Sequence, residues 1–372
     1  MKPSDQPVGH ALAFGDGRIS GYLSATLGLC ALLGVLCFRF PAYLTTAELR
    51  DTLYTAAFSR QLLLVGLVAA FVLGVLSFLL NRRHKRLAAT GIGASFLAVL
   101  LGGASVEPGA ITGSGMALGI DWFVLAFLAS LLVFIPLEKA FAQKPLEVLR
   151  PQWRTDLAYF FVGHVLIQFY LLFTNTVSDT LFAWAHFEGL QGTVRGLPLP
   201  LQFLAAVVLA DTCQYFVHRS YHRTPWLWRF HAVHHSAPHL DWLAGSRMHV
   251  VEVLITRTAV IVPLYLVGFS EPALNGYVLL VGVQAVLAHA NVNWRFGPLR
   301  YVLVTPQYHH WHHARDPAYA DANYAVHLPV IDMLFGTFRL PGDAWPERYG
   351  VIEPEVPRGF VRQLVFPFRP AA

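Results

Sequence analysis

Histidines are the residues whose spacing in this chain indicates a chemical function. Seventeen of the 372 residues are His. Eight of them form one HxxxH and two HxxHH motifs: His218 and His222, then His231, His234 and His235, then His309, His312 and His313. On a helix, residues three or four positions apart share a face. One HxxHH is expected by chance only about 0.03 times in a chain of this composition. Two such motifs therefore predict that the imidazoles are clustered for a function.

Metal binding is the chemistry that such a cluster favours. Buried polar groups need partners, and neutral imidazole binds Zn, Cu, Fe and Ni. A structural zinc takes four ligands, so eight histidines indicate two metal ions. His289 ends an uncharged apolar segment, and we interpret it as a ninth ligand. The motifs contain no Cys, and the three Cys of the chain form no CxxC pair, which argues against a zinc finger or an iron–sulfur cluster.

Other polar residues near the motifs could complete the site. Ligating histidines usually donate their second ring N–H to a carboxylate or a carbonyl group. The candidates, either as ligands or as partners of ligands, are His249, Asn291, Asn293, Asp211, Asp241, Glu252, Asp321, Asn323 and His327. On a continuous helix Asn293 shares a face with His289. His310 is rotated about 100° from His309, so we expect it to make at most a surface contact or a contact to a ligand. His10, His84, His164, His186 and His239 are interpreted as ordinary structural histidines.

The elements that must position these residues are membrane helices. Only 13% of the chain is charged and 55% is hydrophobic, whereas a soluble domain carries about 25% charged residues. A membrane span needs about 20 apolar residues. The predicted spans are residues 21–38, 61–80, 87–105, 118–137, 157–173 and 199–216, followed by two weaker ones at 250–268 and 274–289. Glu252 and Arg257 interrupt the seventh segment, which is either a full span or one arm of a re-entrant hairpin.

Basic loops predict the orientation. Lys and Arg collect in residues 81–86 and 139–154, while residues 106–119 contain neither. Because cytoplasmic loops are enriched in Lys and Arg, we expect the N-terminus, the histidine motifs and the C-terminus to face the cytoplasm. The first apolar segment is too long for the core of a signal peptide and is interpreted as a retained span. The predicted fold is an all-α, polytopic membrane bundle with a cytosolic helical cap that holds a histidine-ligated dinuclear metal site.

Residues 153–349 resemble the fatty acid hydroxylase/sterol desaturase superfamily of membrane di-iron enzymes. The resemblance rests on Asp211–His222 continuing into Trp228–Ser236, on His289-Ala-Asn291, and on Thr305–His313 followed by Asn323-Tyr and Asp332–Thr337. It implies two Fe ions in a cytosolic cap, with O2 as co-substrate for hydroxylation or desaturation of a sterol, fatty acyl or related lipid. The first three spans lie outside the usual core of the family, and the resemblance says nothing about them. We therefore predict an N-terminal extension with about three spans (1–115), a catalytic core (116–350) and a cytosolic tail (351–372), in a multi-pass protein of a bacterial inner membrane.

The expected partners follow from what the sequence lacks. No GxGxxG follows a strand and no haem-attachment motif is present, so electrons must come from a separate reductase with a cytochrome b5-like or ferredoxin-like carrier. Overexpressed protein could load zinc, because zinc competes for imidazole sites. The net charge of +5 is interpreted as a topology signal, and no nucleic-acid partner is expected.

Two alternatives stay open. An ether-lipid monooxygenase of the alkylglycerol type has the same motif set, so the motifs do not distinguish it from an acyl or sterol hydroxylase. A histidine-rich metal transporter or sensor is the other alternative. Transport sites are expected near the bilayer midplane on broken helices, often with internal repeats, whereas these motifs follow the ends of spans and show no repeat.

Overall fold

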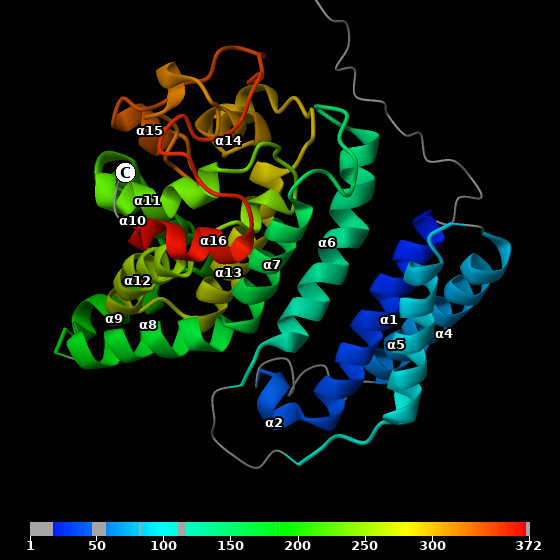
Figure 1. The fold of residues 1–372 in the computed structure, drawn as a ribbon. Helices are drawn as coiled ribbons and strands as arrows, with labels where there is room; N and C mark the ends of the chain where they lie inside the picture. The colour runs from blue at the N-terminus through cyan, green and yellow to red at the C-terminus, as the bar shows by residue number, and fades with distance from the viewer. Residues whose placement is uncertain are drawn as a thin grey trace, which may run out of the picture. The chain divides into compact units, whose positions relative to one another are not determined.

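Helices are the regular secondary structure of the residues that the computed structural model describes, which are 18–46, 57–81, 83–110, 117–182, 184–185 and 187–369. Within these ranges no β-strand forms, and the extended pairings are two isolated bridges, Ala142 with Val292 and Ala314 with Tyr349. Seven helices are long and apolar enough to cross a membrane, and a bent helix pair makes a possible eighth span. The predicted all-α membrane bundle is confirmed (Figure 1).

Two compact units divide the chain, Met1–Phe127 and Leu128–Ala372. The first unit contains α1 (Arg18–Arg39), α2 (Pro41–Leu44), α4 (Ala57–Leu80), α5 (Lys85–Leu100), η1 (Gly103–Ser105) and the start of α6 (Ile120–Ala140). Helices α1, α4 and α5 correspond to the first three predicted spans and pack together. Gly28 and Gly91 permit the close approach of α1 to α5, since a Cβ on Gly28 would lie 2.7 Å from the carbonyl oxygen of Gly91.

Helix α10 (Leu199–Arg223) lies at the centre of the histidine-bearing part of the second unit. The other long helices of this unit are the rest of α6, α7 (Trp153–Val165), α8 (Ile167–Leu181), α12 (Val250–Val267) and α13 (Glu271–His289), and the short helix α9 (Glu188–Arg195) packs against α12. Helix α10 packs against both α12 and α13. Ala206 and Ala210 of α10 are fully buried beside Val260, Leu264 and Tyr277. Small residues let membrane helices approach closely, and here they bring the His-bearing helix ends into one region.

The structure gives the shape of the fifth and the seventh predicted spans, residues 157–173 and 250–268. The fifth is not one straight helix, because α7 and α8 are bent by 52° at a break near Leu166. The seventh is one continuous helix, α12, despite Glu252 and Arg257. It is therefore long and apolar enough to be a full span.

Short helices form the remainder of the second unit. They are α11 (Pro225–His235), η2 (Ala244–Ser246), η3 (Gly297–Tyr301), α14 (Pro306–His312), η4 (Pro317–Tyr319), α15 (Val330–Leu334), α16 (Phe360–Val365) and η5 (Phe366–Phe368). In Figure 1, α11, α14 and α15 gather at one end of this unit. Helix α16 packs against α7, with the rings of Tyr159 and Phe360 4.8 Å apart, so this part of the predicted C-terminal tail is packed on the core.

Some sequence predictions fall on residues outside the described ranges. These are His10, His186 and the expected domain boundary between residues 115 and 116. The division of the chain into an extension, a core and a tail therefore stays a prediction.

Candidate metal centre

Nine buried or half-buried histidines form two groups in the second unit. The first group is His218, His222, His231, His235 and His312, and the second is His234, His289, His309 and His313. Within each group, one ring nitrogen of every member lies within 4.8 Å of those of the others. The structure thus brings together all nine histidines that the sequence nominated as ligands.

The junction between α10 and α11 brings the first two motifs together. Pro225 is the first residue of α11, a position where its missing N–H leaves no bond unmade. His218 and His222 lie one turn apart at the end of α10, with ring centroids 5.3 Å apart. His231 and His235 lie one turn apart on α11, with ring centroids 4.7 Å apart. Two i, i+4 pairs on adjoining helices therefore supply four of the five imidazoles in the first group.

The two HxxHH motifs divide between the groups in opposite ways. On α11, the i, i+4 pair belongs to the first group and His234 belongs to the second. At α14, His309 and His313 belong to the second group and His312 belongs to the first. The rings of His235 and His313 stack at 4.3 Å and join the groups. The sequence predicted one shared face for each motif and missed this division.

Local sequence also explains where α14 begins. The Oγ1 atom of Thr305 accepts a hydrogen bond from the backbone N–H of Tyr308 at 3.3 Å, which satisfies one of the free donors at a helix start. Pro306 follows at the first helical position. The third motif is consequently held on a short helix with a fixed beginning.

Hydrogen bonds in the first group indicate which ring nitrogen of His218 and of His231 carries the proton. His218 Nδ1 lies 2.7 Å from the carbonyl oxygen of Tyr324, and a carbonyl only accepts, so this nitrogen is the donor. His231 Nδ1 lies 2.6 Å from Oε1 of Glu252 and donates to it when Glu252 is ionised. The Nε2 atoms of the two neutral rings then carry lone pairs, yet they are 2.9 Å apart. Two facing lone pairs at this distance call for a cation between them.

The second group repeats the arrangement. His234 Nδ1 donates to the carbonyl of Arg247 at 3.0 Å, and His289 Nδ1 donates to the carbonyl of Ala285 at 2.8 Å. Their Nε2 atoms face each other at 3.3 Å, and Nε2 of His309 lies 3.0 Å from that of His289. Convergent acceptor nitrogens are what a metal ion requires of its imidazole ligands.

Two further rings of the first group also have an Nε2 lone pair without a partner. His222 and His312 donate through Nδ1 to the carbonyls of Ala320 and Ala322, at 3.0 and 2.8 Å. The Nε2 atoms of both rings are buried and have no hydrogen-bond partner among the described residues. Buried polar atoms are normally satisfied, so these nitrogens fit a bound metal.

Burial keeps the histidines of the cap neutral. It lowers the pKa of His231, His234 and His235 well below the ordinary value, and neighbouring imidazoles lower it further. Burial and neighbouring imidazoles have the same effect on the pKa values of the third motif, at His309, His312 and His313. A metal-ligating imidazole must be deprotonated. The rings therefore offer lone pairs without first losing a proton.

Glu252 is the carboxylate nearest to the first group. It lies on α12 and is fully buried, and the His231 contact described above occupies its Oε1 atom. Its other oxygen, Oε2, is buried with no partner among the described residues. Of the acidic residues nominated from the sequence, Glu252 is the one that the structure places against a ring of the cluster.

A buried ionic network supports the second group, and the sequence analysis missed most of it. Arg247, whose carbonyl accepts from His234, also donates through Nε to Asp156 at 2.6 Å. Arg150 donates through Nε to Asp241 at 2.7 Å and lies 2.8 Å from Asp156. Arg150 is 1% exposed, so counting it as an ordinary cytosolic loop charge was wrong. The sequence did contain a signal for this network. In a chain with only 13% charged residues, the presence of both Arg and Asp near the motifs favours buried ion pairs.

Asp211 and Asn323 hold the loop that supplies carbonyl groups to the first histidine group. Asp211 accepts from the backbone N–H groups of residues 326–328, at 2.6–3.2 Å. The Asn323 amide donates to the carbonyls of residues 308 and 339. Asp332, which the sequence analysis did not nominate, accepts from the N–H of Tyr324 at 2.8 Å. These residues position the loop and do not belong to the histidine groups.

The predicted position of Asn293 on the helical face of His289 was wrong. Helix α13 ends at His289, so the i+4 relation does not exist, and Asn293 is exposed. Asn291 exchanges two hydrogen bonds between its side chain and the backbone of Lys144, at 2.9 and 2.7 Å. Asp321 is 47% exposed. None of these three side chains belongs to either histidine group.

His249 and His327 also lie outside the two groups. His249 caps α12 by accepting from the N–H of Val251, and its Nε2 donates to the carbonyl of Leu364, so it ties down the C-terminal segment. His327 Nδ1 lies 2.7 Å from Oε1 of Gln284. Its Nε2 is buried and unpartnered among the described residues.

His310 is not at the surface. It is 1% exposed, its Nε2 donates to the carbonyl of His289 at 3.2 Å, and its Nδ1 accepts from the hydroxyl of Tyr349 at 2.9 Å. Burial lowers the pKa of His310 to about 3. The ring lies off the metal-binding groups, as its helical position predicted, but it holds the backbone of one of their members.

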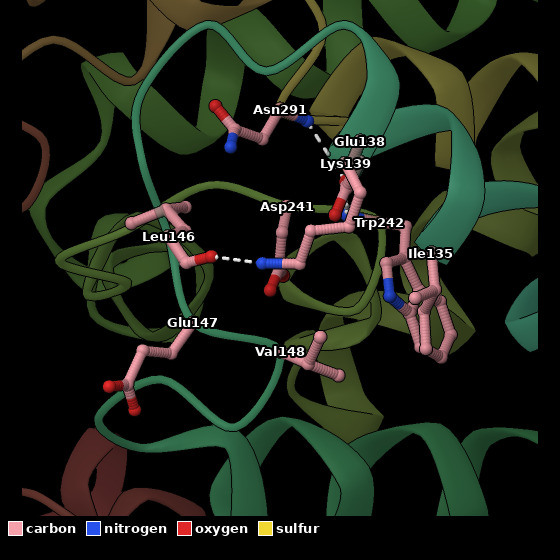
Figure 2. Close-up of a pocket in the computed structure, with 9 residues that line it drawn as sticks. All are labelled: Ile135, Glu138, Lys139, Leu146, Glu147, Val148, Asp241, Trp242 and Asn291. Carbon is pink, nitrogen blue, oxygen red and sulfur yellow. Dashed lines mark hydrogen bonds between the residues drawn. The ribbon is translucent and has the colours of Figure 1, made fainter. Parts of the chain in front are cut away.

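A small hollow lies near the second group and is distinct from it. Figure 2 shows its lining: Ile135, Glu138, Lys139, Leu146, Glu147, Val148, Asp241, Trp242 and Asn291. Glu138 accepts from the N–H groups of Trp242 and Asn291 at 2.6 and 2.9 Å. None of the nine histidines lines this hollow, so it is not the candidate metal centre.

Fold and site together define a helical membrane protein with two buried histidine groups that could hold metal. Comparison with known families identifies the class more closely. Residues 203–337 match the family model described as fatty acid hydroxylase. These residues therefore match a fatty acid hydroxylase domain, which confirms the resemblance seen in the motifs.

Curated relatives share the same region. The chain is 34% identical over 171 residues to ornithine lipid hydroxylase OlsE of Rhizobium tropici, covering 46% of this chain and 51% of the relative. It is 31% identical over 140 residues to the human alkylglycerol monooxygenase, covering 37% and 31%. It is 26% identical over 192 residues to the very-long-chain aldehyde decarbonylase GL1-6 of rice, covering 48% and 28%. The chain thus spans about half or less of these relatives, and no solved structure matches it.

Proposed function

We propose that the chain is an integral membrane di-iron oxygenase that uses O2 to hydroxylate or desaturate a lipid. The observation that carries the proposal is the pairing of fixed-tautomer Nε2 lone pairs in both histidine groups. The curated relatives named as a lipid hydroxylase and an alkylglycerol monooxygenase support a lipid substrate and O2 as co-substrate.

The histidines would bind the metal, and other groups orient the histidine rings. The five histidines of the first group would hold one iron and the four of the second group the other. When bound, the irons supply the activation of O2 needed to break an unactivated C–H bond. Glu252 and backbone carbonyls hold six of the nine rings in the tautomer that presents Nε2, namely His218, His222, His231, His234, His289 and His312. The packing around the rings excludes water from the site, because most of them are almost wholly buried.

The remaining features of the proposal concern the membrane and the electron source. We place the histidine groups and the C-terminus on the cytoplasmic side of a bacterial inner membrane, on the strength of the basic loops. Electrons then come from a soluble reductase through a cytochrome b5-like or ferredoxin-like carrier. We retain residues 1–115 as an extension, 116–350 as the catalytic core and 351–372 as a C-terminal segment. Ether-lipid cleavage uses the same site and stays the alternative.

Metal content tests the dinuclear centre. Full-length protein purified in detergent should contain about two transition-metal ions per chain, iron in the active form and zinc after overexpression. His231→Ala should lower the content, because it removes a ring from the first group, while His239→Ala should not. A folded, fully loaded wild-type sample with one ion per chain would refute the dinuclear site.

Lipid analysis tests the reaction. Lipids of a deletion strain and of strains complemented with wild type or His231→Ala are compared by mass spectrometry under 18O2. Wild type alone should restore a lipid that carries one 18O atom, or one that lacks two hydrogens. Appearance of a free glycerol and an aldehyde from an ether lipid would instead establish the alternative. Identical lipids in all strains would refute an oxygenase.

A further inference from the structure

Arg257 is a charged residue near the middle of α12 that the metal centre does not use. It lies within Val250–Val267, a segment apolar enough to span a membrane. A charge at this depth is costly, and such residues usually mark a substrate path or a binding site. Arg257 therefore calls for a partner.

The structure shows no acidic partner for it. Among the described side chains, no carboxylate forms an ion pair or a hydrogen bond with Arg257. The guanidinium carbon lies 5.6 Å from the ring centroid of Tyr170, and the charge also interacts with Tyr277. Both tyrosines are buried, so the guanidinium faces the interior of the bundle. Arg257 itself keeps partial exposure, so the surrounding protein does not cover it completely.

A second polar atom near this region is also unsatisfied. Nε2 of His327 is buried without a partner among the described residues, and its ring centroid lies 5.7 Å from that of Tyr277. His327 is 1% exposed and Tyr277 is 6% exposed. The guanidinium of Arg257 and the imidazole nitrogen of His327, both without a partner among the described side chains, thus both neighbour one buried tyrosine, Tyr277.

Position along α12 relates this region to the metal centre. Arg257 follows Glu252 by five residues, which is about 7.5 Å along a helix axis. Helical side chains tilt toward the N-terminus of their helix, and on α12 this is the end that carries Glu252 and its contact to His231. A group bound at Arg257 would therefore lie one to two turns from the histidine groups.

We propose that Arg257 binds the acidic group of the lipid substrate within the bundle. A planar guanidinium donates two parallel hydrogen bonds to a carboxylate or a phosphate, and such a ligand would neutralise the buried charge. The proposal rests on the proposed oxygenase function and adds to it the class of substrate, a lipid with an acidic group. It also places the oxidised carbon near the acidic group of the lipid and far from the distal end of its hydrocarbon chain.

Equilibrium binding tests the proposal without requiring turnover. Full-length wild type, Arg257→Gln and Arg257→Lys in neutral detergent are titrated with radiolabelled palmitate, with phosphatidic acid and with hexadecanol, which has the same chain as palmitate without the acid. Arg195→Gln is the matched control, because Arg195 donates to the carbonyl of Gly268 beyond the C-terminal end of α12. Arg257→Gln should weaken binding of at least one acidic ligand about tenfold and leave hexadecanol unchanged. Arg257→Lys should fall between it and wild type, and Arg195→Gln should match wild type.

The two acidic ligands distinguish a carboxylate from a phosphate as the bound group. If Arg257→Gln does not fold, Arg257→Lys decides the matter through the same ratio of acid to alcohol affinity. Equal effects on acid and alcohol, or no effect on either acid, would overturn the proposal and leave a structural role for Arg257. A wild-type protein that makes no O2-dependent lipid product would instead refute the oxygenase, whatever the binding ratios are.

Discussion

Replacing Glu252 by Gln isolates the role of one carboxylate in metal binding. The side chain keeps its size and can still accept the Nδ1–H of His231, but the acceptor becomes neutral. The present contact is short, 2.6 Å, and joins two side chains that are 4% and 1% exposed, so solvent does not screen the charge. Loss of such a partner typically lowers metal affinity about 10–100-fold, which corresponds to about 1.4–2.8 kcal/mol.

Only one of the two metal ions should respond. Glu252 touches the first histidine group, whereas in the second group the Nδ1 atoms of His234 and His289 donate to backbone carbonyls. A chelator titration of iron-loaded Glu252→Gln should therefore release one ion per chain at lower chelator concentration and the other at the wild-type concentration. Asp321→Asn, a change of the same kind at a half-exposed carboxylate, is the control. Simultaneous early release of both ions, or wild-type release of both, would refute the assigned role of Glu252.

Three other predictions test the surroundings of the site. His310→Ala should destabilise the protein by about 1–3 kcal/mol in reversible unfolding, because it leaves the carbonyl of His289 and the hydroxyl of Tyr349 unpaired; an unchanged stability would mean that these bonds contribute nothing. Burial lowers the pKa of His327 to about 4, so its unfolded form binds the extra proton between pH 6.5 and 4, and stability present above pH 6.5 is lost as the pH falls through this window. The stability of wild type relative to His327→Gln should therefore decline by up to about 3 kcal/mol from pH 7 to 4, and a constant difference would contradict the assignment. Reporter tags within residues 106–119 should lie on the periplasmic side of the membrane and a tag after Ala372 on the cytoplasmic side; the opposite result for the C-terminal tag would remove the proposed electron route.

Local periodicity explains why the membrane helices and the histidine motifs could be predicted. A span is about 20 apolar residues because the bilayer sets its length, and α1, α6 and α13 follow that rule closely. An i, i+4 pair needs only a helix to share a face, which His231 and His235 confirm. These predictions required no knowledge of which helices are neighbours.

Features that depend on distant parts of the chain were not predictable in this way. The division of each HxxHH motif between two groups requires α11 and α14 to face each other, which no local spacing encodes. Asn293 failed because the helix ends four residues earlier. Arg150 was counted as a topology signal because its partner Asp241 is 91 residues away, and only tertiary packing shows that this charge is buried.

The opposite division of the two HxxHH motifs has a physical consequence for the centre. His234 and His235 are consecutive and point about 100° apart on α11, so one short helix contributes to both metal positions, and the consecutive His312 and His313 do the same at α14. A change in a side chain that touches one ring, such as Glu252, acts on one position. A change in the packing of α11 itself, where Ala232 and Val233 are fully buried, moves ligands of both positions together. The backbones of α11 and α14 are therefore the elements expected to set the spacing of the two proposed metal positions.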